Sequence, residues 1–259
     1  MASLVADHRG HGPMTIDVRR DGPLWRVRLA APERRNALSR LMLAELRRVF
    51  ASADDCGGMV LTGEGGAFSA GADLHDLSGT PDDLAYDDDL SRTVHLIRTA
   101  PFPVLAALEG PCVGAAVELA LACDLRVAAS DAFLQIPAVE LGLLYNPRTI
   151  ARLHRTLPRD TVTRLVLLGE RFTAASAQAA GLVSEVAEPG EAAARAEEIA
   201  TGIVPGPGSA SFAATRRLLA DLDLGAFDAE HWHRVRLDLL GSDTRRRAVA
   251  AAKDRLEHR

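Results

Sequence analysis

The chain has 259 residues, of which 47% are hydrophobic and 25% charged, and its formal net charge is −5. These values are typical of one well-buried globular core with a small appendage, and they argue against broad charge attraction to nucleic acid or membranes. The three cysteines, Cys56, Cys112 and Cys123, form no CxxC spacing and no even-numbered framework of the secreted type. We therefore expect reduced thiols in a cytoplasmic protein without a membrane segment, since Glu118 and Asp124 interrupt the longest apolar run.

The first elements predicted along the chain are a hairpin and a helix. We expect residues 1–13 to be a polar lead-in rather than a signal peptide, and residues 15–19 and 25–29 to pair around the turn Asp21-Gly22-Pro23. Ser39 is predicted to cap a helix that continues to about Phe50. The side chains expected on its buried face are Leu41, Leu43, Leu46 and Val49.

Two apolar runs, residues 59–62 and 104–108, predict buried strands, and each leads through glycine and alanine into a helical pattern. The two segments that follow are GEGGAFSAGADL (63–74) and EGPCVGAAVELALACD (109–124). Small residues let a ligand approach the backbone closely, and amides at a helix start are unpaired donors at the positive end of the peptide dipoles. Two such turns aimed at one point would form an oxyanion hole, with Glu118 one helical turn beyond the second.

The remaining pattern indicates a spiral core followed by helices. A weaker strand-and-helix unit is expected at residues 125–141, and the acidic run within 81–98 is predicted to be a solvated loop entering an amphipathic helix. Recurring strand-then-helix units favour a stacked spiral rather than two separate sheets. Alanine-rich helices are predicted at 191–203, 209–220, 226–240 and 242–256, with a linker at 204–209. We therefore divide the chain into a core domain, 1–204, and a C-terminal helical domain, 205–259.

The motif pair FSAGADL and EGPCVGAAVELALACDLRVA resembles the enoyl-CoA hydratase/isomerase (crotonase) family, and the resemblance extends from about residue 16 to the last helix. It implies an α/β fold, a spiral of ββα turns with a C-terminal helical domain that mediates trimer contacts, often in hexamers. It also implies an acyl-CoA thioester substrate, with coenzyme A as part of that substrate, no permanently bound cofactor, and a role of the fatty-acid-metabolism type.

The same resemblance assigns site residues. The oxyanion donors would be the backbone N–H groups of Ala72 and Ala115, the latter standing where relatives commonly have glycine, and Glu118 matches one of two acid/base carboxylates. Positions in or beside these motifs that would contact CoA or substrate are Arg34, Arg35, Ala70, Asp73, Leu74, Gly114 and Ala138. From the residues alone, Asp73 and Asp124 are better interpreted as structural acids that hold their own turns.

Three departures leave the reaction open. The family's second carboxylate, four residues before Gly142, falls on Ala138, although Glu140 would share its face if a strand continued that far. The C-terminal AAKDRLEHR lacks the aromatic residue that covers a neighbouring subunit's CoA in relatives. The stretches AYDDDL and PAVELGLLYN are similar to methylmalonyl-CoA decarboxylase, where a tyrosine matching Tyr145 is implicated in the active site, but that enzyme has a histidine where Ala72 stands.

Other site classes lack support. The chain has no phosphate-loop lysine, no dinucleotide fingerprint and no GxSxG elbow, and the pair His231 and His233 has no third ligand nearby, so no metal site is predicted. The open hypotheses are an enoyl-CoA hydratase or isomerase using Glu118, a malonyl-type decarboxylase assisted by Tyr145, and a catalytically weak acyl-CoA-binding protein.

Overall fold

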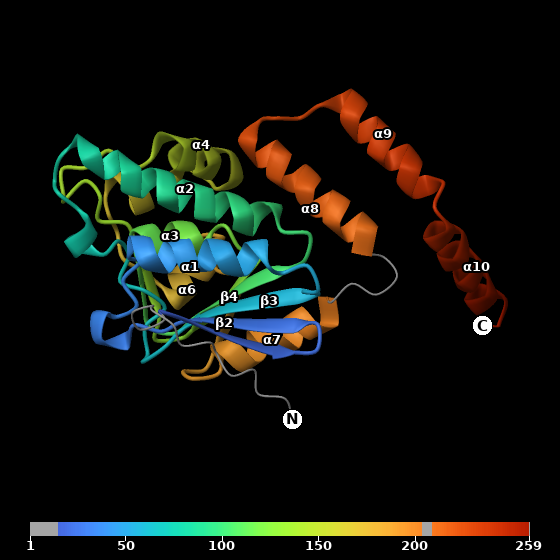
Figure 1. The fold of residues 1–259 in the computed structure, drawn as a ribbon, viewed down its shortest axis with the longest axis horizontal. Helices are drawn as coiled ribbons and strands as arrows, with labels where there is room; N and C mark the ends of the chain where they lie inside the picture. The colour runs from blue at the N-terminus through green and yellow to red at the C-terminus, as the bar shows by residue number, and fades with distance from the viewer. Residues whose placement is uncertain (1–14, 204–208, 259) are drawn as a thin grey trace.

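The computed structural model of the chain describes residues 15–203 and 209–258, which form a mixed α/β fold with a helical C-terminal region (Figure 1). The predicted lead-in and nearly all of the predicted linker lie outside the described residues. The division at residue 204 therefore stays a prediction.

The described strands form one sheet of six strands and one of three. The larger sheet has the order β1-β2-β3-β4-β6-β9, with β1 antiparallel to β2 and every other pair parallel. Its strands are β1 (Ile16–Asp21), β2 (Leu24–Leu29), β3 (Gly58–Gly63), β4 (Val104–Leu108), β6 (Leu125–Ala129) and β9 (Glu185–Ala187). The smaller sheet contains β5 (Pro111–Val113), β7 (Phe133–Gln135) and β8 (Phe172–Thr173).

From β4 to β7 the chain alternates between these two sheets, which makes this part of its path a spiral. Strands β4 and β6 belong to the larger sheet, and the strands that directly follow them, β5 and β7, belong to the smaller one. The predicted ββα spiral is therefore confirmed. The expectation that it excludes two sheets is wrong, because the pairs β4–β5 and β6–β7 each contribute one strand to each sheet.

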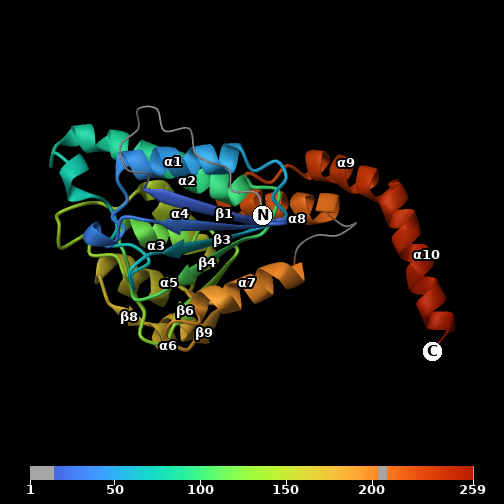
Figure 2. The same cartoon turned by 60° about the horizontal axis from the view of Figure 1, so that its bottom comes forward.

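Helices cover both faces of the larger sheet. Figures 1 and 2 show α1, α2 and α3 on one side and α7 on the other. All five residues of β4 are buried, as expected for a parallel strand covered on both faces. The helices are α1 (Arg40–Ala51), α2 (Leu84–Thr99), α3 (Ala115–Ala120), α4 (Pro147–Thr156), α5 (Arg159–Val162), α6 (Ala174–Ala179), α7 (Ala192–Ile203), α8 (Ser209–Leu224), α9 (Ala229–Leu240) and α10 (Asp243–Glu257).

The N-terminal predictions are largely confirmed. The hairpin forms, and the Ser39 side chain accepts from the Met42 amide at the start of α1. The buried face of α1 contains Met42 rather than Leu41, which is 47% exposed. The reason is helical phase, because Met42 and Leu46, four positions apart, lie on one face and Leu41 is rotated away from them.

Two local predictions are wrong. The second part of the acidic run, residues 87–89, lies inside α2 rather than in a loop, and within it Asp89 is buried where it pairs with Arg40 and Arg47 of α1. The ion pairs with α1 compensate for burying the Asp89 carboxylate in the helix. The local charge pattern could not indicate these partners, because they lie more than 40 positions away in the sequence. After β7 no helix forms within residues 136–142, where backbone bonds from Leu141 and Leu143 to the Ala138 carbonyl make a turn instead.

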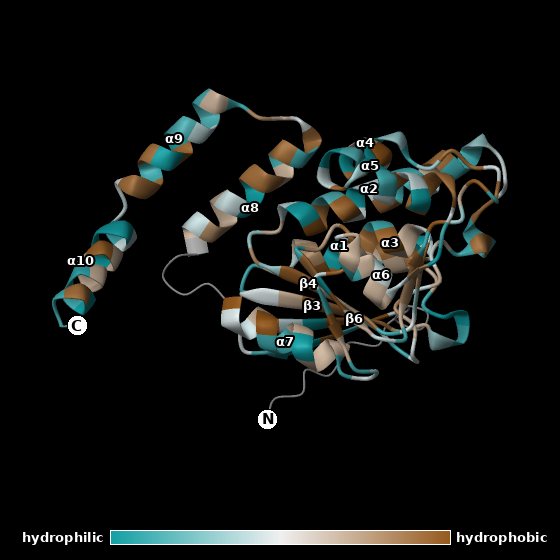
Figure 3. Cartoon of the chain, turned by 180° about the vertical axis from the view of Figure 1, so that it is seen from behind, coloured by the Kyte–Doolittle hydropathy of each residue, from teal (hydrophilic) through white to brown (hydrophobic). Residues whose placement is uncertain are grey.

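The C-terminal helices differ in how they meet the core. Helix α8 lies against α2 and α4, whereas α9 and α10 extend away from it (Figures 1 and 2). Figure 3 shows apolar and polar stretches alternating along α9 and α10, and neither helix buries a residue. None of the helices in the described ranges has the length and hydrophobicity required to cross a bilayer.

Candidate active site

The two glycine turns singled out from the sequence lie side by side, joined by backbone hydrogen bonds. The amides of Phe68 and Ser69 both donate to the Pro111 carbonyl at 3.1 Å. In return the Val113 amide donates to the Ser69 carbonyl at 3.1 Å. The structure therefore brings together two segments more than 40 positions apart, as the motif pair predicted.

Gly71 sets how closely the turns approach. Its φ is +92°, and a Cβ built on it would lie 2.4 Å from the Val113 carbonyl oxygen and 3.4 Å from the Ala115 nitrogen. Real Cβ atoms essentially never lie within 3.0 Å of another heavy atom, so this approach requires glycine on steric grounds as well as on conformational ones. The residue that follows, Ala72, is thereby held beside the start of α3.

The amides of Ala72 and Ala115 are not used by the local backbone hydrogen bonds. Ala72 forms an isolated parallel bridge with Leu38, but the two bonds of that bridge are Leu38 N–H to Gly71 C=O (2.7 Å) and Asp73 N–H to Leu38 C=O (3.3 Å). Ala115 is the first residue of α3, so its amide has no acceptor inside the helix. Within the described part of the chain, neither N–H group donates to a backbone carbonyl.

The loop around Ala72 is fixed by Asp73. Its carboxylate is almost fully buried, accepts from the His75 amide at 3.0 Å and pairs with the Arg34 guanidinium. The structural interpretation of Asp73 is therefore confirmed. Arg34 is half-exposed and already paired, whereas Arg35 is exposed without an acidic partner among the described residues.

Of the residues near Arg35 and Ala72, one holds the loop in place and two lie on the surface. Asn36, which follows the two arginines, is completely buried, accepts from the Ala31 amide and donates to the carbonyls of Glu64 and Ala67. It holds the loop and is not available to a nucleotide. Ala70 and Leu74, by contrast, are exposed on either side of Ala72.

Glu118 lies on α3 with 2% of its surface exposed. The Thr149 hydroxyl of α4 donates to its Oε1, while Oε2 has no hydrogen-bond partner among the described residues. Burial raises the pKa of Glu118, although the Thr149 hydrogen bond, the positive charge of Arg152 and the Tyr145 hydroxyl each act to lower it. A buried carboxyl with one unpaired oxygen and a raised pKa is suited to exchange protons with a bound ligand.

Tyr145 lies beside this carboxyl. Its ring is buried, and its hydroxyl donates to the Gly114 carbonyl at 3.2 Å, directly before the Ala115 amide. Burial raises the pKa of Tyr145, and the negative charge of Glu118 raises it further, so the phenol stays protonated. The structure thus brings Gly114, Ala115, Glu118 and Tyr145 together.

The position of the absent second carboxylate is filled by a buried alanine. Ala138 is 5% exposed, and Glu140 lies on the surface. Strand β7 ends at Gln135, so strand alternation does not carry Glu140 to the face of Ala138.

A second acid near Glu118, Asp87 on α2, was not among the site residues predicted from the sequence. Its charge raises the pKa of both Glu118 and Tyr145, and burial raises its own pKa. One helical turn further on, Ser91 accepts from the Asn146 side chain at 3.2 Å, so this face of α2 meets the segment that carries Tyr145. The run AYDDDL contained the signal, but only the helix that starts at Leu84 places Asp87 one turn before Ser91 and partly buries it.

The histidine pair and Asp124 lie outside this site. No group of three or more potential metal ligands occurs in the described ranges, and His231 and His233 are exposed. Asp124 accepts from the Val104 amide at 2.7 Å and pairs with Arg216 of α8, so its structural interpretation is confirmed.

Comparisons with known proteins place the chain in a family. The family model described as Enoyl-CoA hydratase/isomerase matches residues 20–232. "Probable enoyl-CoA hydratase echA6" of Mycobacterium tuberculosis is 38% identical over 176 residues, which are 67% of this chain and 71% of that protein. The mitochondrial Delta(3,5)-Delta(2,4)-dienoyl-CoA isomerase of Rattus norvegicus is 36% identical over 177 residues, 62% of this chain and 54% of that protein.

A solved structure of an enoyl-CoA hydratase from Polaromonas sp. JS666 superposes with a TM-score of 0.82 at 29% identity, covering 93% of this chain and 97% of that one. The fold of this chain is therefore that of solved enoyl-CoA hydratase structures. The chain belongs to the enoyl-CoA hydratase/isomerase family.

Proposed function

We propose that the protein acts on acyl-CoA thioesters by stabilising a thioester enolate, with Glu118 moving the proton. The observation that carries this proposal is the pair of unused amides, Ala72 and Ala115, on turns held together by hydrogen bonds, with an unpaired buried carboxyl oxygen on the helix that begins at Ala115. No permanently bound cofactor is needed, because coenzyme A arrives as part of the substrate.

The chemistry follows from where negative charge develops. When a proton leaves, or a nucleophile adds in conjugation, electrons move onto the thioester oxygen. Two preorganised amides strengthen their hydrogen bonds as that charge grows, and removing one such donor typically costs about 3–4 kcal/mol of barrier. Glu118 would take a proton from one carbon and return it to another in an isomerisation, or protonate the α carbon while water adds at the β carbon in a hydration.

Hydration needs a second group to activate water, and Ala138 cannot supply one. We propose Asp87 for this role, because it is the acid that acts electrostatically on both Glu118 and Tyr145. Asp87→Asn should then lower hydration by about 10²-fold or more while isomerisation by Glu118 persists. Asp88→Asn is the matched control, since Asp88 is exposed on the same helix and should change neither rate.

Two other functions remain open and have their own tests. Decarboxylation of a malonyl-type thioester releases carbon dioxide, leaves its electron pair as the enolate and needs only the hole and a proton, which the Glu118–Tyr145 pair could deliver. A non-catalytic acyl-CoA binder is favoured by the alanine at position 138.

The deciding experiment offers the purified protein three substrates. Loss of the enoyl thioester absorbance with crotonyl-CoA indicates hydration, a shifted double bond with a 3-enoyl-CoA indicates isomerisation, and carbon dioxide from methylmalonyl-CoA indicates decarboxylation. Glu118→Gln should abolish the first two while CoA affinity measured by calorimetry is nearly unchanged. A full rate in that variant would remove Glu118 from the mechanism, and tight thioester binding without turnover would establish the binder.

CoA contacts and assembly belong to the same proposal. The free guanidinium of Arg35, with Arg34 beside it, suits the nucleotide phosphates. Helices α9 and α10 bury no residue in one chain and expose large apolar side chains, Leu237, Leu240 and Leu256. We propose that these helices pack in a homotrimer or hexamer in the cytoplasm, which light scattering of the intact protein tests.

A further inference from the structure

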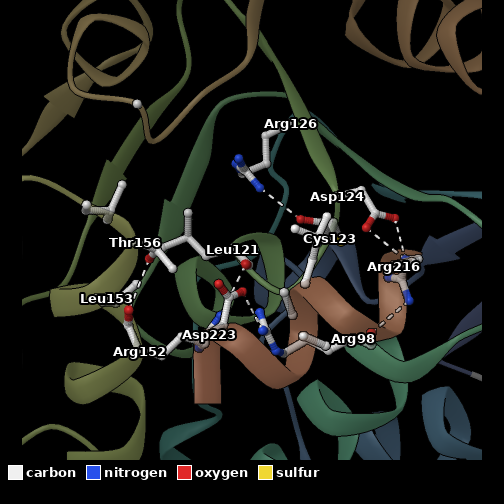
Figure 4. Close-up of a pocket in the computed structure, with 15 residues that line it drawn as sticks. Arg98, Leu121, Cys123, Asp124, Arg126, Arg152, Leu153, Thr156, Arg216 and Asp223 are labelled. Carbon is white, nitrogen blue, oxygen red and sulfur yellow. Dashed lines mark hydrogen bonds and ion pairs between the residues drawn. The ribbon is translucent and has the colours of Figure 1, made fainter. Parts of the chain in front are cut away.

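A cavity of about 250 Å³ lies at the C-terminal end of α3, where α8 meets the core, away from the paired glycine turns. Four arginines line it, each from a different element: Arg98 of α2, Arg126 of β6, Arg152 of α4 and Arg216 of α8 (Figure 4). The acidic residues in the lining are Asp124 and Asp223. Positive charges in the wall therefore exceed negative ones by two.

Two of the four arginines are neutralised. Arg216 is 6% exposed, and its Nε lies 2.8 and 2.9 Å from the two carboxylate oxygens of Asp124. Its other nitrogens donate to backbone carbonyls at the end of α2. Arg98 pairs with Asp223 at 2.6 Å. These contacts hold α8 on the core and consume both carboxylates.

The other two, Arg126 and Arg152, have only carbonyl partners among the described residues. Arg126 donates to the carbonyls of Leu182 and Cys123 at 2.7 and 2.9 Å, and Arg152 donates to that of Leu121 at 3.2 Å. Burial lowers the pKa of both guanidinium groups, and the nearby carboxylates offset this only in part. Arginine nevertheless stays charged in proteins, so two excess charges persist in the wall.

Two arginine side chains of the lining also contain unpaired donors. Among the residues that the structure describes, Nη2 of Arg152, a residue that is 4% exposed, and the buried Nε of Arg98 have no hydrogen-bond partner. A buried donor without an acceptor is costly, and a charged one more so. Planar guanidinium donors match the oxygens of phosphate-like anions in both geometry and charge.

We propose that this cavity binds a small tetrahedral oxyanion carrying two negative charges, of the inorganic phosphate or sulfate class. Such an anion balances the two excess charges that Arg126 and Arg152 leave in the wall. Its volume fits easily, since the cavity holds roughly eight times the liquid volume of one water.

The site is coupled to the candidate active site through Arg152. Glu118 faces Arg152 and Thr149 on α4, Tyr145 before that helix, and Asp87 on α2. Of these groups Arg152 is the cation, and an anion beside it weakens its attraction for the Glu118 carboxylate. An occupied cavity therefore favours the protonated acid; this consequence rests on the proposed function, whereas the binding does not.

Calorimetric titration of the intact protein with inorganic phosphate at constant ionic strength tests the binding. We expect one saturable site per chain, and about tenfold weaker affinity in Arg126→Gln, which removes one charge. Asp223→Asn, which removes a competing carboxylate, should bind more tightly, so the two variants move in opposite directions. Arg159→Gln is the control, because Arg159 is exposed and outside the cavity.

The proposal is overturned if the wild type shows no saturable heat of phosphate binding, or if the wild type and the three variants bind phosphate with equal affinity. It is also overturned if CoA displaces phosphate, because the anion would then be at the nucleotide site. Coupling is measured separately from the pH–rate profile with and without sulfate, which stays doubly charged. The limb governed by Glu118 should move to higher pH with sulfate, and an unmoved limb with intact binding refutes only the coupling.

Discussion

Replacing Gly71 by alanine tests the close approach on which the candidate oxyanion hole depends. The new Cβ would lie 2.4 Å from the Val113 carbonyl oxygen and must retreat to at least 3.0 Å, so the turn has to shift by about 0.6 Å. Left-handed φ costs an alanine about 1–2 kcal/mol, and overpacking adds about 1–3 kcal/mol. Gly66→Ala is the matched control, because Gly66 also has positive φ, +74°, but meets nothing within 4 Å.

Both variants are compared with wild type by urea denaturation and by turnover of whichever thioester proves to be the substrate. Gly66→Ala should lose about 1–2 kcal/mol and keep its rate. Gly71→Ala should lose about 1–3 kcal/mol more, and because it displaces Ala72 from Ala115 its rate should fall by at least about tenfold. Equal stability and equal rate in the two variants would refute the claim that this contact sets the spacing of the two amides.

Two further outcomes are expected. Burial raises the pKa of Glu118, so the free energy of unfolding of the wild type falls as pH rises from the carboxyl's unfolded pKa through its folded pKa. In denaturant melts, Glu118→Gln should therefore match wild-type stability near about pH 4 and exceed it near about pH 8. A difference that is the same at both pH values would contradict this. Asp124→Ala leaves Arg216 without its carboxylate and the Val104 amide without its acceptor, so it should cost about 3 kcal/mol in urea denaturation. Asp124→Asn keeps an acceptor for that amide and should lose clearly less, whereas equal losses would show that the hydrogen bond to Val104 contributes nothing.

The sequence alone determined the elements whose information is local. The apolar run at 104–108 forms β4 with the predicted bounds, and Ser39 caps α1, because burial of a short strand and capping of a helix depend on neighbours in the chain. The motif pair also located the two turns and Glu118. The resemblance to the family could also be seen without coordinates, because its motifs are short stretches of consecutive residues.

Only the tertiary structure decided what surrounds Glu118. Its hydrogen bond comes from Thr149, 31 positions away, and the charge of Asp87 acts on its pKa from within α2. The arginine cavity likewise depends on Arg216 of α8 reaching Asp124 across 92 positions. Periodicity and turn chemistry report on a few neighbouring residues, whereas burial of a charge and the identity of its partner depend on how distant segments pack.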